Sequence, residues 1–244
     1  MEDIFVKKNI TFTIIIPVYN CEEFINKCVI SIINQKREDV ELILIDDGSA
    51  DKSPIICENL AKKYENIIVI KKTNTGVSDS RNLGISIANG KYVLFADADD
   101  YFEENYFTEI DNIISKYEGI ELINFGFYSE VCKESETLSS DLIRYEDKYY
   151  NSRDEIKQDF IDLWDSSMLY NVWNKVYIKK IIEKNNIKFP NIYFGEDVEF
   201  NKEYLQNIHN FYNSEKAFYH YVRERKGSVT KSFKEDIFLS LIHI

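Results

Sequence analysis

The sequence predicts an α/β protein with a doubly wound, mainly parallel sheet and helices on both of its faces. Strand-like and helix-like segments alternate through the first hundred residues, as expected of repeated βα units. The strand-like segments are continuous apolar runs, which are typical of strands buried on both faces. Polar clusters directly follow these runs. Ligands of such sheets bind at the carboxyl ends of the strands, so the clusters mark a candidate site.

The first half follows this pattern element by element. The expected strands are residues 12–18, 40–45, 67–70 and 92–96. Asn20 is expected to cap the first helix, because Glu23 stands at the third helical position in capping-box spacing. Pro54 suits the first turn of a second helix. A third helix is expected over residues 77–89, with Gly90 as a left-handed C-cap.

The second half is less regular. Helices are expected over residues 102–117, 154–164 and 175–185, and strands over residues 120–128 and 218–222. No repeat and no Pro/Gly-rich boundary separates the halves, so one domain is expected. Residues 1–102 would form its regular half, residues 103–230 its irregular half, and residues 231–244 a final helix. The apolar stretch 236–244 fits a docking helix, an interfacial helix or the cut edge of a longer protein.

Composition limits the classes of partner and the compartment. The 244 residues carry a net charge of −12, which argues against nucleic acid as the main partner because no general basic field exists. Four cysteines without CxxC spacing indicate reduced thiols in the cytosol. No signal peptide and no apolar run near 20 residues is present. A cytoplasmic protein is expected, and the apolar C-terminus leaves open a peripheral contact with the inner face of the plasma membrane.

The apolar run 92–96 ends directly in acid, at Asp97, Asp99 and Asp100. Carboxylates held this close repel one another unless a cation sits between them. Mg²⁺ and Mn²⁺ prefer such oxygen ligands and usually bridge protein carboxylates to substrate phosphates. The segment therefore suggests a metal–diphosphate site, and a solvated acidic turn is the alternative.

Taken in order, the polar clusters resemble those of the inverting family 2 glycosyltransferases, which have the GT-A fold. The matching segments are Pro17-Val18-Tyr19-Asn20, Asp46-Asp47-Gly48-Ser49-Ala50-Asp51, Asn74-Thr75-Gly76 with Ser80-Arg81-Asn82-Leu83-Gly84, and Asp97-Ala98-Asp99-Asp100. Each segment alone is a weak signal, but the ordered set is specific. The second half is similar to a bacterial surface-polysaccharide branch at Val172-Trp173-Asn174-Lys175-Val176-Tyr177, Phe194-Gly195-Glu196-Asp197 and Tyr219-His220-Tyr221.

The resemblance implies that residues 1–102 bind a UDP-sugar donor. By position, Asp47 would hydrogen-bond the uracil ring, since a carboxylate suits its imide N–H. Tyr19 would flank the base, and Pro17 would shape the same pocket. Arg81 would line the donor pocket. The structural alternatives are a core tyrosine for Tyr19, turn chemistry for Asp47 and a helix-surface salt bridge for Arg81.

The resemblance also implies a divalent cation, Mn²⁺ or Mg²⁺. Asp99 would ligate the ion, and Asp97 would hold the donor's ribose or a metal-bound water. His220 is a further candidate ligand, although a packed histidine is the favoured alternative.

In the acceptor half, residues 103–230, Asp197 matches the family's catalytic base, which removes the proton from the acceptor hydroxyl. Glu196 would lie beside it on the acceptor side. A solvated helix start with favourable dipole placement also fits this acidic pair. Trp173 could form a platform for the acceptor sugar, and core packing fits it equally well.

Arg223, Arg225 and Ser228 are expected on a loop that closes over the diphosphate, because Arg forks suit phosphate oxygens. A plain basic surface is the equal alternative for these three residues.

The implied reaction is a single displacement that inverts the anomeric centre, with a glycan or a lipid-linked saccharide as acceptor. A nicotinamide-dependent enzyme is disfavoured, since no GxGxxG turn follows the first strand. The rival interpretation is a catalytically inactive nucleotide-sugar-binding module of a polysaccharide-assembly protein. The oligomeric state is left open, with a homodimer among the alternatives.

Overall fold

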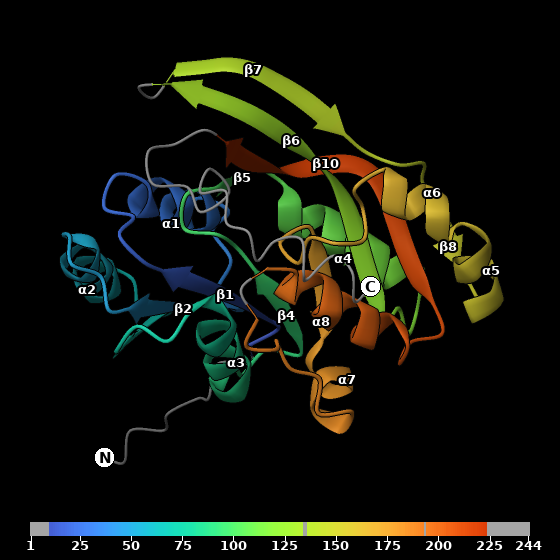
Figure 1. The fold of residues 1–244 in the computed structure, drawn as a ribbon, viewed down its shortest axis with the longest axis horizontal. Coiled ribbons are helices and arrows are strands. Elements are labelled where there is room, and N and C mark those ends of the chain that lie inside the picture. Colours follow the sequence, from blue (N-terminus) through green and yellow to red (C-terminus); the bar gives the residue numbers. More distant parts are fainter. Residues whose placement is uncertain (1–9, 134–135, 193, 224–244) are drawn as a thin grey trace.

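The computed structural model describes residues 10–133, 136–192 and 194–223. Its centre is a ten-stranded sheet flanked by helices (Figure 1). Four neighbouring strands at one side of this sheet, in the order β3-β2-β1-β4, are all parallel. They are β1 (Phe12–Val18), β2 (Val40–Asp47), β3 (Ile67–Lys72) and β4 (Tyr92–Phe95). All residues of β2 are buried, which explains why its sequence is a continuous apolar run up to its acidic end.

Beyond β4 the sheet continues in the order β9-β6-β10-β5. β9 runs antiparallel to both β4 and β6, and β10 runs parallel to β6. β1, β2, β3, β4, β6 and β10 therefore share one direction, and the predicted mainly parallel sheet is confirmed. β7 pairs with β6, and β8 pairs with β10. The bounds are β5 (Tyr101–Phe102), β6 (Leu122–Lys133), β7 (Glu136–Ile143), β8 (Lys148–Tyr150), β9 (Lys175–Ile178) and β10 (Phe211–Arg223).

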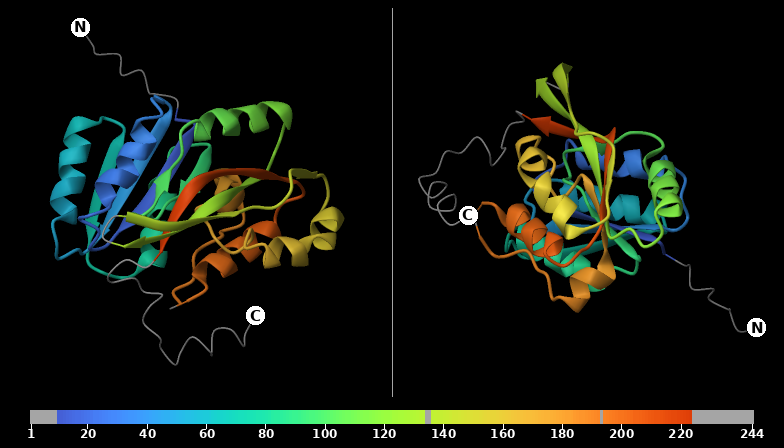
Figure 2. Two further views of the ribbon diagram at one scale, coloured as in Figure 1. Left: turned by 90° about the horizontal axis from the view of Figure 1, so that it is seen from above. Right: turned by 90° about the vertical axis from the view of Figure 1, so that its right-hand side faces the viewer.

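Helices cover both faces of the sheet (Figure 2). Alternate side chains of β1 show the two layers, since Ile14 packs in one apolar core and Ile15 in the other. One core contains residues of α1 (Ile25–Ile33), α2 (Ser53–Lys63) and α4 (Tyr106–Lys116). The other contains residues of α3 (Val77–Ile87), α5 (Arg153–Gln158), α6 (Phe160–Asp165), α7 (Lys179–Lys184) and α8 (Glu196–Leu205). The predicted α/β class is thus confirmed.

The predicted helix over residues 175–185 is wrong in its first four residues. Lys175–Ile178 forms β9, and the helix α7 begins only at Lys179. Both faces of β9 are buried, with Val176 in one core and Tyr177 in the other. The buried lysine within this short apolar run concealed the strand pattern.

Two predicted helix caps are also wrong. Asn20 has a left-handed backbone (φ 49°), and α1 begins five residues later. Gly90 is not left-handed, because α3 ends at Ile87 with Ala88 as its C-cap. Gly90 instead allows close packing, since a Cβ there would lie 2.6 Å from the backbone nitrogen of Thr13.

The predicted final helix, residues 231–244, lies outside the described residues. Within the described ranges, no helix combines the length and the apolar composition that crossing a bilayer requires.

Candidate active site

Asp47 lies at the carboxyl end of β2 and ties the loop after β3 to the sheet. Its carboxylate accepts hydrogen bonds from the backbone N–H groups of Thr75 (2.9 Å) and Gly76 (2.9 Å). It also forms an ion pair with Lys72, its register partner at the end of β3. Sequence reasoning assigned no role to Lys72, because its pairing with Asp47 depends on the register between β2 and β3. Asp47 therefore shapes this edge of the sheet.

The loop that leaves β1 lies beside the loop that leaves β2. The N–H of Asn20 donates to Ser49 Oγ (3.0 Å), and its Oδ1 accepts from the N–H of Ala50 (2.8 Å). Tyr19 keeps 51% of its surface exposed, while Pro17 is half-buried within β1. The arrangement leaves the Tyr19 ring accessible to a planar ligand at the edge of the sheet, so the core-tyrosine alternative is wrong.

β10 holds the acidic turn after β4 in place. The Tyr219 hydroxyl donates to Asp100 Oδ2 (2.7 Å) and accepts from the Asp97 N–H (3.0 Å). The N–H of Val222 donates to Asp100 Oδ1 (2.8 Å). Burial, together with the nearby carboxylates of Asp99 and Asp97, raises the pKa of Asp100 well above its usual range. Asp100 thus anchors the turn, while Asp97 and Asp99 are only half-buried.

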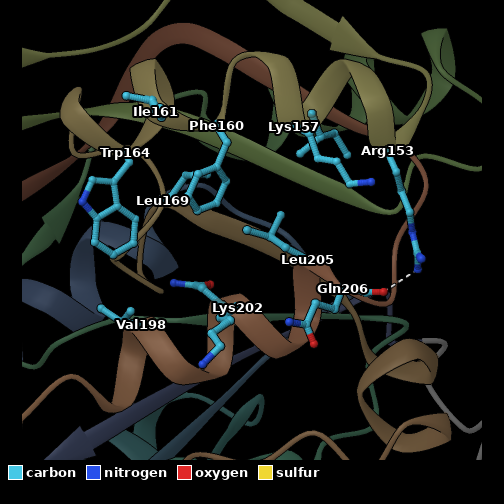
Figure 3. Close-up of a pocket in the computed structure, with 12 residues that line it drawn as sticks. Arg153, Lys157, Phe160, Ile161, Trp164, Leu169, Val198, Lys202, Leu205 and Gln206 are labelled. Carbon is cyan, nitrogen blue, oxygen red and sulfur yellow. Dashed lines mark hydrogen bonds between the residues drawn. The ribbon is translucent and has the colours of Figure 1, made fainter. Parts of the chain in front are cut away.

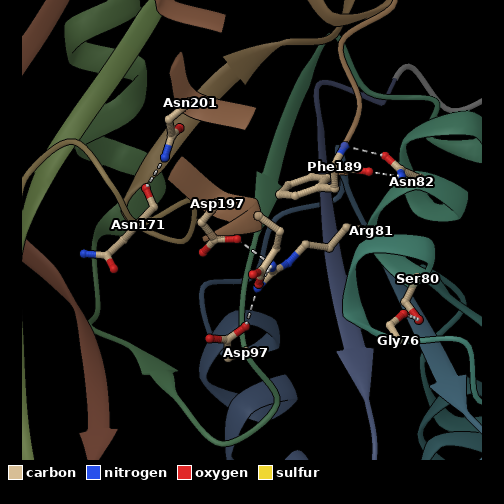
Figure 4. A network of polar contacts seen from close by, with 10 residues as sticks. Gly76, Ser80, Arg81, Asn82, Asp97, Asn171, Phe189, Asp197 and Asn201 are labelled. Carbon is tan, nitrogen blue, oxygen red and sulfur yellow. Dashed lines mark hydrogen bonds and ion pairs between the residues drawn. The ribbon is translucent and has the colours of Figure 1, made fainter. Parts of the chain in front are cut away.

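Arg81 of α3 joins the acidic turn to the start of α8 (Figure 4). Its guanidinium pairs with Asp97 (3.1 Å), Glu196 (3.2 Å) and Asp197 (2.6 Å). The Arg81 side chain is buried, and its Nε has no hydrogen-bond partner among the described residues. The helix-surface alternative for Arg81 is therefore wrong. Asn82 exchanges two hydrogen bonds with the backbone of Phe189 (2.8 and 2.9 Å), which ties α3 to the segment before α8.

The pKa of the Asp197 carboxyl group is higher in the protein than in water. Burial is the largest cause and raises its pKa to about 7. Arg81 opposes this shift, whereas the charges of Glu196 and Asp97 add to it. A carboxylate with this pKa can exchange protons near neutral pH, which suits a general base.

α8 is anchored one turn beyond Asp197. Asn201 donates to the backbone oxygen of Asn171 (3.1 Å) and accepts from the Tyr177 hydroxyl (2.6 Å). The buried Lys175 donates to the same Asn171 oxygen (2.5 Å), and burial lowers its pKa well below the usual value. β9 therefore fixes the position of the helix that carries Asp197. Sequence reasoning missed this support because it placed Lys175 on a helix.

Two predicted site residues are integrated into the core. Trp173 is buried, and its ring stacks on Tyr219 (4.6 Å between centroids) and Tyr221 (5.4 Å). This position favours the core-packing alternative over a sugar platform. His220 is bonded through both ring nitrogens, with Nδ1 2.8 Å from Glu130 and Nε2 2.8 Å from Glu103. The arrangement favours the packed alternative for His220 over a role as metal ligand.

The predicted diphosphate loop falls largely outside the described part of the chain. Arg223 ends β10, where its guanidinium lies 3.9 Å from Asp141 of β7. Arg225 and Ser228 lie outside the described residues.

The family model "Glycosyl transferase family 2" matches residues 13–184. The chain belongs to glycosyl transferase family 2. The matched range includes Asp47, Arg81 and the acidic turn, whereas Asp197 lies beyond it.

Curated relatives of this family 2 chain come from several bacteria. It is 30% identical over 220 residues to "Uncharacterized glycosyltransferase EpsJ" of Bacillus subtilis, which covers 90% of this chain and 62% of that protein. It is 33% identical over 229 residues to "Glycosyltransferase GlyA" of Streptococcus pneumoniae, and the match covers 91% of this chain and 32% of GlyA. It is 33% identical over 227 residues to the "Poly(ribitol-phosphate) beta-glucosyltransferase" of Bacillus spizizenii, and the match covers 88% of this chain and 32% of that protein. The family 2 chain thus spans 32% to 62% of the length of these relatives.

The fold of this family 2 chain is similar to that of solved structures of S. aureus TarS. The structure of S. aureus TarS 1-349 in complex with UDP-GlcNAc superposes with a TM-score of 0.73 at 22% identity. The likeness covers 92% of this chain and 62% of TarS 1-349. A similarity of this kind establishes the shared fold.

The acidic turn of this family 2 chain offers carboxylate oxygens, the ligand type that divalent cations such as Mg²⁺ prefer. Among the described residues, no group of three or more His, Cys, Asp or Glu side chains is arranged to hold a metal ion. Mg²⁺ and its analogues are commonly held by one or two carboxylates together with waters and substrate phosphates. Three carboxylates also converge on the single Arg81 guanidinium, so the cluster attracts further positive charge. Asp99 and Asp97 are the residues that would hold the ion.

Proposed function

We propose that this chain transfers a sugar from a UDP-sugar to a hydroxyl of a bacterial surface glycan or its lipid-linked precursor, with inversion at the anomeric carbon. One observation carries the proposal. The buried Arg81 brings Asp97, at the donor edge of the sheet, together with Asp197 at the start of α8. Carboxylates that we assign to the donor side and to the acceptor side therefore share one cluster, which supports a displacement between two substrates.

In the proposed reaction Asp197 is the general base. Its Oδ1 accepts from Arg81, and its Oδ2 has no hydrogen-bond partner among the described residues. Oδ2 would take the proton of the acceptor hydroxyl as the acceptor oxygen bonds to the anomeric carbon. The bond from that carbon to the diphosphate oxygen of UDP breaks in the same step. The proposed step uses Asp197 as its one carboxylate base and needs no side-chain nucleophile. As in inverting glycosidases, the base lies on the face of the sugar opposite the leaving group.

The remaining residues would bind the donor. Tyr19 and Pro17 would flank the uracil ring, and Asp47 would border the base pocket through the loop it holds. A divalent cation bound at Asp99 and Asp97 would neutralise charge on the leaving diphosphate. Glu196 would orient the Arg81 guanidinium beside the base.

The substrate class rests on relatives. The UDP-GlcNAc complex of TarS supports a UDP-sugar donor, and the poly(ribitol-phosphate) beta-glucosyltransferase supports a cell-wall polymer as acceptor. The transferred sugar is to be identified by experiment.

The direct test measures UDP release from a panel of UDP-sugars, with Mn²⁺ and a cell-wall glycan acceptor. Asp197→Asn should lower turnover by at least about 100-fold, because general-base catalysis typically contributes 10²- to 10⁴-fold. Glu199→Gln is the matched control, since Glu199 lies in the same first turn of α8 and pairs with Lys202 at the surface. It should retain turnover within about twofold.

The anomeric configuration of the product, read by NMR, completes the test. An α-donor should give a β-product. A wild-type protein that binds UDP-sugars without turnover would instead identify an inactive binding module. Retention of configuration, or full activity in Asp197→Asn, would refute the assigned mechanism.

A further inference from the structure

β7 is an edge of the sheet that projects beyond the body of the domain. Among the described residues, β6 is the one strand with which it pairs. The β6–β7 pair stands clear of the helices in Figure 1, and the right-hand view of Figure 2 shows the same projection. One side of β7 therefore presents backbone N–H and C=O groups that no strand of the described chain pairs. Such an edge is a template for a further strand.

The exposed edge of β7 has little of the protection that sheet edges usually carry. Proteins protect edges with lysine, proline or covering elements. β3, at the other end of the sheet, ends in Lys71 and Lys72. Residues 137–143 of β7 contain neither lysine nor proline, and Leu138 and Leu142 are 62% and 44% exposed. An edge of this kind favours pairing with another strand.

The geometry of antiparallel pairing allows few registers in which β7 pairs with a second copy of itself. Opposite residues both direct their hydrogen-bonding groups into the pair, or both direct them away, and these two states alternate along a strand. A two-fold axis must therefore pass beside a residue. The register centred on Ser140 pairs residues 137–143 and places Leu138 opposite the partner's Leu142. The register centred on Ser139 is equally long, but it places Leu138 opposite a serine.

We propose that two copies of this chain associate reversibly by antiparallel pairing of their β7 strands, with the two-fold axis beside Ser140. Leu138 and Leu142 of both copies then share one face of the joined sheet, because side chains alternate between faces. Apolar cross-strand pairs of this kind stabilise a sheet. Asp141 lies on the other face, opposite the partner's Ser139, so no two like charges oppose each other over residues 137–143.

A second exposed apolar surface, the groove between α5–α6 and α8, suits this symmetry less well (Figure 3). Its volume is about 580 Å³, and Phe160, Trp164 and Leu205 are among its lining residues. In a two-fold dimer the same surface of each copy meets its mate. Two facing grooves would enclose a void, whereas a strand edge is complementary to itself. The groove therefore provides the control surface, and Ile161, 70% exposed, is its most accessible apolar residue among those described.

The test is sedimentation equilibrium of the full chain over a series of concentrations. The wild type should show a monomer–dimer equilibrium. Ser140→Lys places two like charges opposite each other at the axis and should raise the dimer dissociation constant about fivefold or more. Ile161→Lys is the matched control, because it adds the same charge at an exposed position in the groove, and it should leave the dissociation constant unchanged. Circular dichroism verifies that each variant is folded.

A mixing experiment examines the register itself. Ser140→Glu alone should also weaken the dimer, whereas an equal mixture of Ser140→Glu and Ser140→Lys should associate again, because opposite charges then face each other across the axis. A wild type that stays monomeric throughout the series would overturn the proposal, as would a dimer that Ser140→Lys leaves intact. Dissociation by Ile161→Lys would assign the interface to the groove instead. A mixture that fails to associate would refute the register at Ser140. None of these measurements depends on sugar transfer.

Discussion

Arg81 connects residues that are far apart in the chain, and its charge acts directly on Asp197. The guanidinium lies 2.6 Å from Asp197 Oδ1 and lowers the pKa that burial raises. Without this ion pair the half-buried Asp197 carboxyl group would hold its proton more tightly. We therefore assign to Arg81 the task of holding the pKa of the proposed base near 7, so that a substantial fraction is ionised at neutral pH.

The pH dependence of transfer follows from this pair. A base must be deprotonated to act, so kcat/KM should fall as the pH drops through about 7, the raised pKa of Asp197. Arg81→Gln removes the effect that lowers this pKa, and the acid limb of the profile should move to higher pH. The measurement is a kcat/KM–pH profile from pH 5 to 9.

Arg37→Gln is the matched control for this profile. Arg37 also pairs with two carboxylates, Asp39 and Asp111, but lies away from the acidic cluster. Its substitution should leave the acid limb in place. If the acid limb of the pH profile does not move in Arg81→Gln, Arg81 does not control the ionisation of Asp197.

At the level of elements, the close packing of α3 on β1 positions Arg81. Gly84 lies one turn after Arg81 on α3, and a Cβ at this position would approach Ile15 Cγ2 to 2.4 Å. Only a residue without a side chain allows α3 to approach the strand this closely. Gly84 thus allows α3 to lie close enough to β1 for the Arg81 side chain to reach the acidic residues of the site.

Gly84→Ala should therefore destabilise the protein by about 1–3 kcal/mol through overpacking. Ser86→Ala, on the exposed face of the same helix, should change the unfolding free energy by less than about 0.5 kcal/mol. Urea unfolding of both variants measures the difference. Equal stability of Gly84→Ala and the wild type would show that α3 can move away from β1 without loss.

At the scale of the whole molecule, the candidate site lies where the two halves of one sheet meet. β4 supplies the acidic turn and pairs with β9, while β9 anchors α8 through Lys175 and Tyr177. A ligand that contacts both the acidic turn and α8 would bind only the folded arrangement. Its binding free energy would then stabilise the entire domain.

UDP with Mn²⁺ should consequently raise the melting temperature. A ligand at 100 times its Kd adds about 2.7 kcal/mol, which corresponds to roughly 5–10 °C for a chain of this size. Asp99→Asn should remove the part of the shift that requires Mn²⁺. Asp165→Asn, an exposed acid at the end of α6, should retain the full shift.

A thermal shift by UDP that is identical with and without Mn²⁺ would contradict the proposed role of Asp99. A shift with GDP or CMP of the same size would contradict the uracil pocket at Tyr19 and Asp47.

The sequence by itself determined the alternation of strands and helices and the edge on which the polar clusters lie. Both follow from local rules, because apolar periodicity decides strand or helix and the βα connection places all strand ends together. The order of the clusters also identified the family that the comparison with known sequences shows. These properties depend on neighbours in the chain and were therefore readable along it.

Only the tertiary structure decided which of the candidate residues meet. Arg81 contacts Asp97 and Asp197, whereas Trp173 stacks within the core and His220 is bonded to two glutamates. Residues 175–178 form a strand because they pair with β4 on one side and with β6 on the other. Such pairings depend on the packing of segments distant in sequence, where burial and charge, rather than local pattern, decide each side chain's partner.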